Sequence, residues 1–348
     1  MQKVLCLSAA LFMLASPALA AGAASVSSGA GSRLEAIRAR GALICGLLPQ
    51  VRGFASVDAN DVPSGFDVDT CRAVSAAIFG TPNKTTYVEA RNVAQLSRTD
   101  TDTDIDIVVR RITSSLTRAA NNGLMFGPVT FYDGQGFLVP KKSGVTDPKQ
   151  LNGKTVCVQT VEYHETSVMA YFKASGLSVT PLRVEDDEAA EKALKSGDCA
   201  AFSADVSWLG STRANIKGGI DDYVILPHLI SKEPLAPLVR QGDDQFFNIV
   251  SWSIHAMLVA EEYGITSKNI DSMMNREELE VQQFLGRVPG NGKALGLDEK
   301  WAYNIIKTVG NYAEVFDRNV GAGSPIKLDR GLNKLWRDGG LMYPPRIR

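Results

Sequence analysis

The sequence has few of the features that would place it in several common classes of protein. Its 348 residues include three histidines, and none of its five cysteines form a Cys-x-x-Cys pair, so neither a zinc site nor another cofactor site is expected. No glycine-rich phosphate loop occurs, which argues against ATP binding by this chain. The 37 Lys and Arg are scattered and nearly balance the 38 Asp and Glu, so nothing indicates a nucleic acid or an anionic membrane surface as partner.

Long apolar runs are also rare, and the one with a clear meaning lies at the N-terminus. Lys3 carries the first charge, residues 4–14 are apolar apart from one serine, and residues 16–20 read Ser-Pro-Ala-Leu-Ala. This order is typical of a cleaved secretory signal peptide, and the run is shorter than the roughly 20 residues of a membrane span. We therefore predict a signal peptide over 1–20, a flexible Ala/Gly/Ser leader over 21–32 and a soluble periplasmic protein. A membrane anchor is the alternative.

Removal of the signal peptide would leave four cysteines, Cys45, Cys71, Cys157 and Cys199. An even number in an oxidising compartment favours disulfides, and three connectivities are possible. The pairing between sequence neighbours, Cys45 with Cys71 and Cys157 with Cys199, would put one bridge in each half of the chain. Each bridge would stabilise the fold by ~3–4 kcal/mol in the chain-entropy model.

Strand and helix patterns alternate through the first two thirds of the chain. A first cycle is predicted as a strand at 41–48, a helix at 66–79, and strands at 85–88 and 104–109. A second is predicted as a loop and strand over 151–159, a helix at 165–175, a strand at 177–184, a helix at 188–196 and a strand at 198–204. The alternation indicates two α/β units in tandem, each with a mostly parallel sheet.

From about residue 244 onward the pattern becomes helical. Helices are predicted over 245–262, 265–274, 300–318 and 332–339. A helical tail after the second unit suggests a return to the first lobe, with connecting strands near 137–141 and 224–227. The predicted lobes are therefore 33–138 together with 228–348, and 139–227, with a cleft between them of the kind that ligands prefer.

Several longer motifs resemble one known family. Residues 65–74 (GFDVDTCRAV) are similar to a signature of the periplasmic general L-amino-acid-binding proteins of ABC transporters, in solute-binding protein family 3. Residues 131–140 (FYDGQGFLVP), 230–235 (ISKEPL) and 239–244 (VRQGDD) are similar as well, and the resemblance runs from about residue 34 to the C-terminus.

This resemblance implies an α/β chain with the two-lobed type II periplasmic-binding fold, whose hinged cleft closes on a free L-amino acid or a related small polar molecule. It also implies an inner-membrane ABC permease as partner. We expect a monomeric ligand-binding protein that has no catalytic residues and is not an enzyme.

A free amino acid needs a cation for its α-carboxylate and an anion for its α-ammonium group. Arginine suits the first need because its planar guanidinium binds a carboxylate through two parallel hydrogen bonds. The resemblance places Arg118 in this role, with Thr113 in support, and places Asp205 at the ammonium group. The residues alone are also compatible with a solvated arginine at a helix start and an aspartate that caps a helix.

Two loops depart from the family's pattern. Val161, Glu162 and Tyr163 stand where the family has a glycine and threonines that offer donors at a helix N-terminus. Arg111 stands where the family has asparagine. A carboxylate at Glu162 that faced the cleft would repel an α-carboxylate, and Arg111 could pair with Glu162 or contact a ligand side chain. We predict ligand contacts for Arg111, Glu162 and Tyr163, with solvent-facing side chains as the alternative, and an altered specificity.

Two other functions are compatible with the same fold. A periplasmic enzyme, such as a dehydratase of prephenate-like acids, would use Glu162 and His164 as acid–base groups. A ligand sensor would dock to a membrane partner when closed. Fold alone does not separate these functions from transport.

Overall fold

The computed structural model describes residues 32–58, 60–91, 104–121, 123–160 and 163–347. The predicted signal peptide, the predicted leader apart from Ser32, and Val161 and Glu162 lie outside these ranges. Ser32 caps α1 (Arg33–Arg40), because its hydroxyl accepts from the Glu35 amide while the Glu35 side chain accepts from the Ser32 amide. Within the described ranges, no helix is both long enough and apolar enough to cross a membrane.

The first sheet holds five strands in the order β4-β1-β5-β14-β6. Their bounds are β1 Leu43–Leu47, β4 Thr85–Glu89, β5 Ile107–Val108, β6 Leu124–Phe126 and β14 Leu238–Arg240. β1 is parallel to β4 and β5, whereas β14 is antiparallel to β5 and β6. The sheet is thus mixed, and β14 enters it from a part of the chain more than 100 residues further on.

Helix α2 (Phe66–Phe79) packs on this sheet and is buried along most of its length. It begins after Gly65, whose φ of 136° favours glycine, and ends at Gly80, which adopts the left-handed conformation of a helix C-cap. The disulfide Cys45–Cys71 joins β1 to α2. The pairing predicted between sequence neighbours is therefore present in the first half of the chain.

The second sheet also holds five strands, in the order β10-β9-β11-β8-β12. Their bounds are β8 Gln135–Pro140, β9 Thr155–Gln159, β10 Thr180–Val184, β11 Ala201–Asp205 and β12 Tyr223–Ile225. β9 is parallel to β10 and β11, and β8 is antiparallel to β11 and β12. The disulfide Cys157–Cys199 links β9 to the segment before β11, as predicted. The helices of this part of the chain are α5 His164–Ala174, α6 Asp187–Ser196, α7 Val206–Asn215 and α8 Gly219–Asp222.

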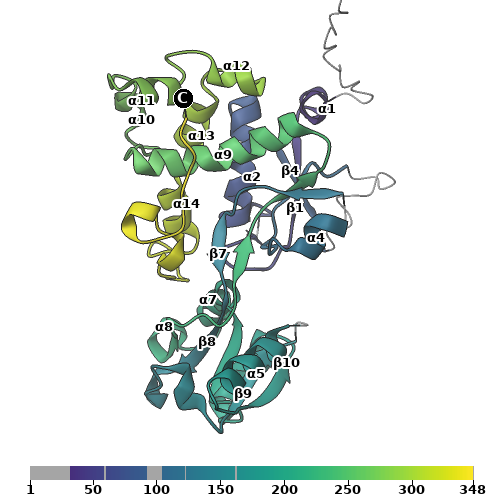
Figure 1. The fold of residues 1–348 in the computed structure, drawn as a ribbon, viewed down its shortest axis with the longest axis vertical. Helices are drawn as coiled ribbons and strands as arrows, with labels where there is room; N and C mark the ends of the chain where they lie inside the picture. Colours follow the sequence, from purple (N-terminus) through teal and green to yellow (C-terminus); the bar gives the residue numbers. More distant parts are fainter. Residues whose placement is uncertain (1–31, 59, 92–103, 122, 161–162, 348) are drawn as a thin grey trace, which may run out of the picture. The chain divides into compact units, whose positions relative to one another are not determined.

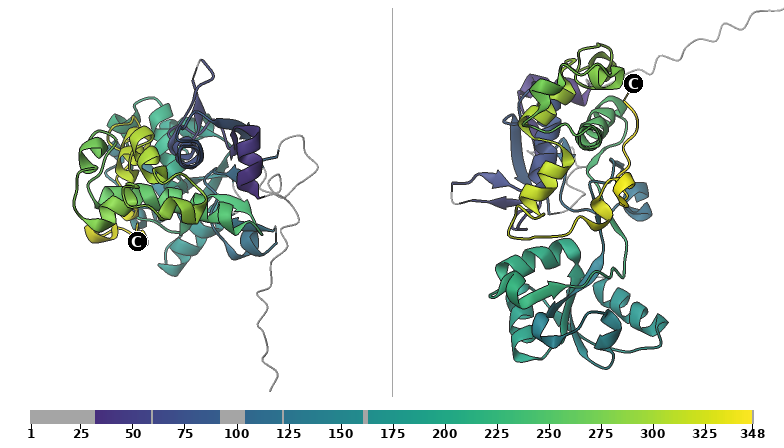
Figure 2. Two further views of the ribbon diagram at one scale, coloured as in Figure 1. Left: turned by 90° about the horizontal axis from the view of Figure 1, so that it is seen from above. Right: turned by 90° about the vertical axis from the view of Figure 1, so that its left-hand side faces the viewer.

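The C-terminal third is helical, and its helices pack in the part of the molecule that contains the first sheet. Helices α9 and α13 contact α2, as the views in Figures 1 and 2 agree. The elements are α9 Asp244–Glu262, α10 Ile270–Met273, α11 Leu279–Phe284, α12 Asn291–Leu295, α13 Trp301–Thr308, α14 Tyr312–Asn319 and the 3₁₀ turns η3 Gly331–Asn333 and η4 Trp336–Asp338. The helix predicted over 265–274 is thus shorter than expected, and the helix predicted over 332–339 is wrong.

The single helix predicted over 300–318 is also wrong, because the chain divides it into α13 and α14. Gly310 has a φ of 97°, which a helix does not allow. Asn311 then caps the start of α14 reciprocally: its side chain accepts from the Glu314 amide, and the Glu314 side chain accepts from the Asn311 amide. Apolar periodicity continues across the break, which explains why the sequence pattern indicated one helix.

Two short antiparallel strands, β7 (Phe131–Asp133) and β13 (Glu233–Leu235), lie where the chain passes between the two sheets (Figure 1). The connecting strands had been expected near 137–141 and 224–227, but those residues belong largely to β8 and β12 of the second sheet. The remaining elements are β2 Ser56–Val57, β3 Pro63–Ser64, α4 Leu116–Asn121, η1 Lys141–Ser143 and η2 Pro148–Leu151.

Candidate functional site

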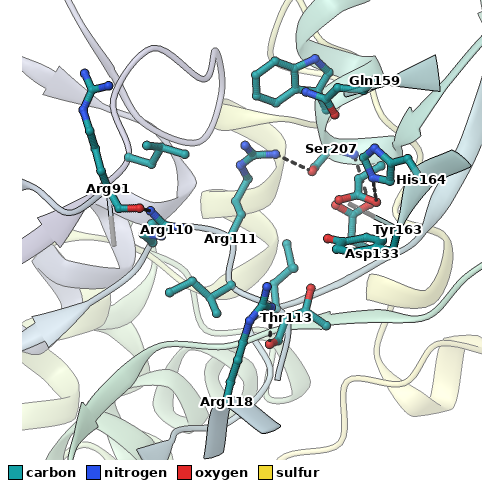
Figure 3. A pocket seen from close by; sticks show the side chains of 15 residues that line it. Arg91, Arg110, Arg111, Thr113, Arg118, Asp133, Gln159, Tyr163, His164 and Ser207 are labelled. Carbon is teal, nitrogen blue, oxygen red and sulfur yellow. Dashed lines mark hydrogen bonds and ion pairs between the residues drawn. The ribbon is translucent and has the colours of Figure 1, made fainter. Parts of the chain in front are cut away.

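A pocket of about 490 Å³ gathers loops from both sheets. Five of the six residues predicted to bind ligand line it: Arg111, Thr113, Arg118, Tyr163 and Asp205. The sixth, Glu162, lies outside the described residues. Figure 3 shows the arginines on one side of the pocket, and Asp133, Tyr163 and His164 on the other.

Arg118 lies on α4, and a loop residue holds its guanidinium. Its Nη1 donates to the Thr113 carbonyl oxygen at 2.9 Å. The Thr113 hydroxyl donates in turn to Glu233 Oε2 at 2.6 Å, and Thr113 pairs with Leu235 through an isolated bridge to β13. Thr113 therefore orients Arg118 through its backbone, while its hydroxyl proton is already bound by Glu233.

Arg111 is held in an unusual backbone conformation. Its φ of 55° lies in the left-handed region, which a residue other than glycine enters at a cost. Its guanidinium lies over the rings of Phe54 and Trp208, 5.5 and 5.3 Å from their centroids, and Nη1 donates to Ser207 Oγ at 3.0 Å. Stacking of this kind fixes the guanidinium plane and leaves its edges for acceptors.

Arg110, next to Arg111 in the chain, is bound to backbone carbonyl groups just after the end of β4. Its Nη1 donates to the carbonyl oxygens of Ala90 and Arg91, at 2.6 and 2.5 Å. Burial, and then the like charges of Arg118 and Arg111, lower the pKa of Arg110. Arg110, Arg111 and Arg118 therefore lie together on one wall of the pocket (Figure 3).

The opposite wall carries two carboxylates. Asp205 ends β11 and stands at the N-cap position of α7, but its side chain makes no capping hydrogen bond. Its Oδ1 lies 3.2 Å from His164 Nε2 instead. Asp133 provides the cap, since its Oδ1 accepts from the amides of Ser207 and Gly134 at 3.1 and 2.9 Å. Asp205 therefore occupies the N-cap position of α7, as the alternative interpretation held, but its side chain does not cap the helix.

Asp133 was missed by the sequence analysis, although it lies within one of the family-like motifs. It is 4% exposed, and its Oδ2 has no hydrogen-bond partner among the described residues. Burial, and then the charge of Asp205, raise the pKa of Asp133 to about 7. A cation bound between Asp133 and Asp205 would favour both ionised carboxylates and so offset the cost of burial and the repulsion.

Tyr163 and His164 complete this wall at the start of α5. Burial, and then the charges of Asp205 and Glu233, raise the pKa of Tyr163 to about 12, so its phenol stays neutral. His164 is 1% exposed and its Nδ1 has no partner among the described residues. His164 had been considered for an enzyme; its position beside Asp205 was not foreseen, because 41 residues separate the two in the chain.

Comparison with known proteins identifies relatives over nearly the whole chain. Residues 43–270 match the model of the bacterial extracellular solute-binding proteins, family 3. A general L-amino acid-binding periplasmic protein of Rhizobium johnstonii is 42% identical over 332 residues, 95% of this chain and 96% of that protein. A glutamate/glutamine/aspartate/asparagine-binding protein of Rhodobacter capsulatus is 43% identical over 332 residues, again 95% of this chain and 96% of the relative.

A solved structure extends the similarity to three dimensions. An ABC transporter periplasmic binding protein from Brucella ovis with glutathione bound is 39% identical, with a TM-score of 0.81. The match covers 92% of this chain and 100% of that one. The two-lobed type II periplasmic-binding fold predicted from the sequence is thereby confirmed.

Proposed function

Because the chain belongs to family 3 of the bacterial extracellular solute-binding proteins, we propose that it captures a free L-amino acid, or a small molecule with an α-amino-acid headgroup. In this proposal a signal peptide at residues 1–20 exports the protein to the periplasm. The lobes, 33–138 with 228–348 and 139–227, close on the ligand, and the closed protein delivers it to an inner-membrane ABC permease. The names of the Rhizobium and Rhodobacter relatives support this class of cargo.

One observation carries the proposal: groups suited to both ends of a zwitterion line the same pocket. Arg118, oriented by the Thr113 carbonyl, offers a guanidinium for the α-carboxylate. Asp133, whose Oδ2 has no partner among the described residues, offers an acceptor for the α-ammonium group on the other wall (Figure 3). Asp205, next to His164, offers another. Tyr163, Arg111 and Glu162 would contact the rest of the ligand.

The test is a calorimetric titration of residues 21–348 with each of the twenty L-amino acids. We expect saturable binding of at least one of them without its consumption, since the relatives are named as binding proteins. An absence of binding to every amino acid and to glutathione would contradict the proposal. Turnover of a bound ligand would favour an enzyme on the same fold, with the His164–Asp205 pair as its acid–base group.

The Arg118→Ala variant should lose about 2–5 kcal/mol of binding free energy, because truncation leaves the ligand's carboxylate desolvated and unpaired. Arg276→Ala is the matched control, since Arg276 pairs with Glu278 at the surface and does not line the pocket. Both variants are titrated with the ligand that the wild-type protein binds most tightly. Equal affinities for Arg118→Ala and the wild-type protein would remove Arg118 from the site.

A further inference from the structure

We propose that the ligand carries a second carboxylate beyond its α-carboxylate, and that Arg111 is the specificity-determining residue that binds it. The inference rests on the proposed function, because it assumes that Arg118 and the Asp133–Asp205 pair hold the amino-acid headgroup. It specifies the chemistry of the rest of the ligand, which the contacts to the headgroup do not determine.

The first support is the number of arginines that line the pocket. Four arginines line it, yet a zwitterion requires one. Arg91 forms an ion pair with Glu89 at 2.7 Å, and Arg110 is bound to backbone carbonyls. Arg118 serves the α-carboxylate in the proposed function. Arg111 is therefore the pocket arginine whose charge the headgroup does not require.

The second support is that no carboxylate of the described residues forms an ion pair with Arg111. Among the described residues no carboxylate lies within ion-pair distance of it, and its one hydrogen-bond acceptor there is the neutral Ser207 Oγ. Asp67 is a buried carboxyl near this loop, and burial raises its pKa to about 7 against the opposing charges of Arg111 and Arg110. A guanidinium has five N–H donors, and among the described residues Ser207 Oγ is the one acceptor bound to those of Arg111.

The third support is the way in which the chain holds Arg111 in place. The left-handed backbone at φ 55° and the two aromatic rings, one from the segment before α2 and one from α7, position the guanidinium at the pocket wall. A solvated surface arginine needs none of these constraints. A side chain held by stacking loses little further freedom when a carboxylate binds, and such preorganisation favours affinity and specificity.

Two sources provide this ligand chemistry. One is an amino acid with an acidic side chain, and the other is a γ-glutamyl peptide such as glutathione, whose far carboxylate follows an amino-acid headgroup. Both share a headgroup and a second carboxylate. The Rhodobacter capsulatus relative is named for glutamate and aspartate together with glutamine and asparagine, and the Brucella ovis protein has glutathione bound. A pocket of about 490 Å³ is within the usual range for small ligands of either size.

The experiment compares ligands that differ only in the second carboxylate. L-glutamate is paired with L-glutamine, L-aspartate with L-asparagine, and glutathione with its glycine ethyl ester, in calorimetric titrations of residues 21–348. The wild-type protein should bind at least one acid roughly 10-fold or more tightly than its neutral partner. The pair with the largest ratio distinguishes the acidic amino acid from the γ-glutamyl peptide.

Arg111→Gln should weaken binding of that acid by about 30-fold or more, while affinity for the neutral partner changes by less than about threefold. Arg111→Lys, which keeps the charge but not the planar fork, should retain part of the preference, and it also serves if Arg111→Gln does not fold. Arg183→Gln is the control, because Arg183 is exposed, pairs with Glu165 and does not line the pocket.

Equal affinity of the wild-type protein for acid and neutral partner would overturn the inference, as would an equal loss for both ligands in Arg111→Gln. Either result would leave the proposed function intact, because an amino acid still binds. Failure of all six ligands and of the other amino acids would instead contradict the proposed function itself.

Discussion

At the scale of single residues, the pocket wall with Asp133 and Asp205 contains a carboxyl group that should lose its proton when a cationic ligand binds. Asp133 is buried beside Asp205, and burial is the larger cause of its raised pKa, about 7. A neighbouring ammonium group favours the ionised carboxylate and lowers this pKa again. Ligand binding and proton release are therefore linked at this residue.

We predict that ligand affinity increases as the pH rises from about 5.5 to 7 and then levels off. Below about pH 7 the binding of an ammonium group must displace a proton from Asp133, whereas above it the carboxylate is already ionised. Calorimetry in two buffers of different ionisation enthalpy would count the released protons. Asp133→Asn should abolish the release, and a wild-type protein that releases no proton at pH 6 would contradict the linkage.

At the scale of elements, the position of Arg111 depends on α2 and on the segment that precedes it. Gly65 starts α2 where a Cβ atom would lie 2.1 Å from the Phe54 carbonyl oxygen. The same Phe54 contributes one of the two rings over Arg111. The glycine that allows this close approach therefore also supports the pocket wall.

Gly65→Ala should destabilise the protein more than Gly80→Ala, although both substitutions place alanine at a positive φ on the ends of α2. Strained φ alone costs of order 1–3 kcal/mol. A Cβ atom at Gly80 would find its nearest neighbour at 3.5 Å, whereas one at Gly65 would collide with backbone. Chemical unfolding of both variants measures the difference, and equal losses would show that the close approach to Phe54 is not needed.

At the scale of the whole molecule, each sheet has its own disulfide and hydrophobic core. Cys45–Cys71 joins β1 of the first sheet to α2, and Cys157–Cys199 joins β9 of the second sheet to the segment before β11, so neither crosses from one sheet to the other. β7 and β13 join the two parts, together with Arg213 of α7, which donates to the Ile326 carbonyl oxygen at 2.6 Å. The disulfides thus stabilise each part and leave the connection between the parts to strands and hydrogen bonds.

Replacement of Cys157 and Cys199 together by alanine should lower the free energy of unfolding by ~4 kcal/mol, since the bridge closes a loop of 42 residues. Ligand affinity of the folded variant should change little, because neither cysteine lines the pocket. Unfolding in denaturant and calorimetry at a temperature well below the transition measure the two effects. A large loss of affinity in the folded variant would show that the bridge also holds the site.

The sequence by itself determined the alternation of strands and helices, the disulfide pairing that was favoured, and five of the residues that line the pocket. These follow from local signals: apolar periodicity, the neighbouring cysteines, and motifs similar to one family. Where the signals misled, as with the helix predicted over 300–318, the helix breaks at Gly310 and Asn311 while the apolar pattern continues on both sides.

Only the tertiary structure decided which side chains meet. Asp133 caps α7 across 74 residues of sequence, His164 reaches Asp205 across 41, and Arg111 reaches Ser207 across 96. Such contacts depend on strand order and register, which periodicity does not specify. For the same reason the arginine that the sequence marked as a departure from its family became a candidate for specificity only when two aromatic rings and a neutral hydroxyl were found around it.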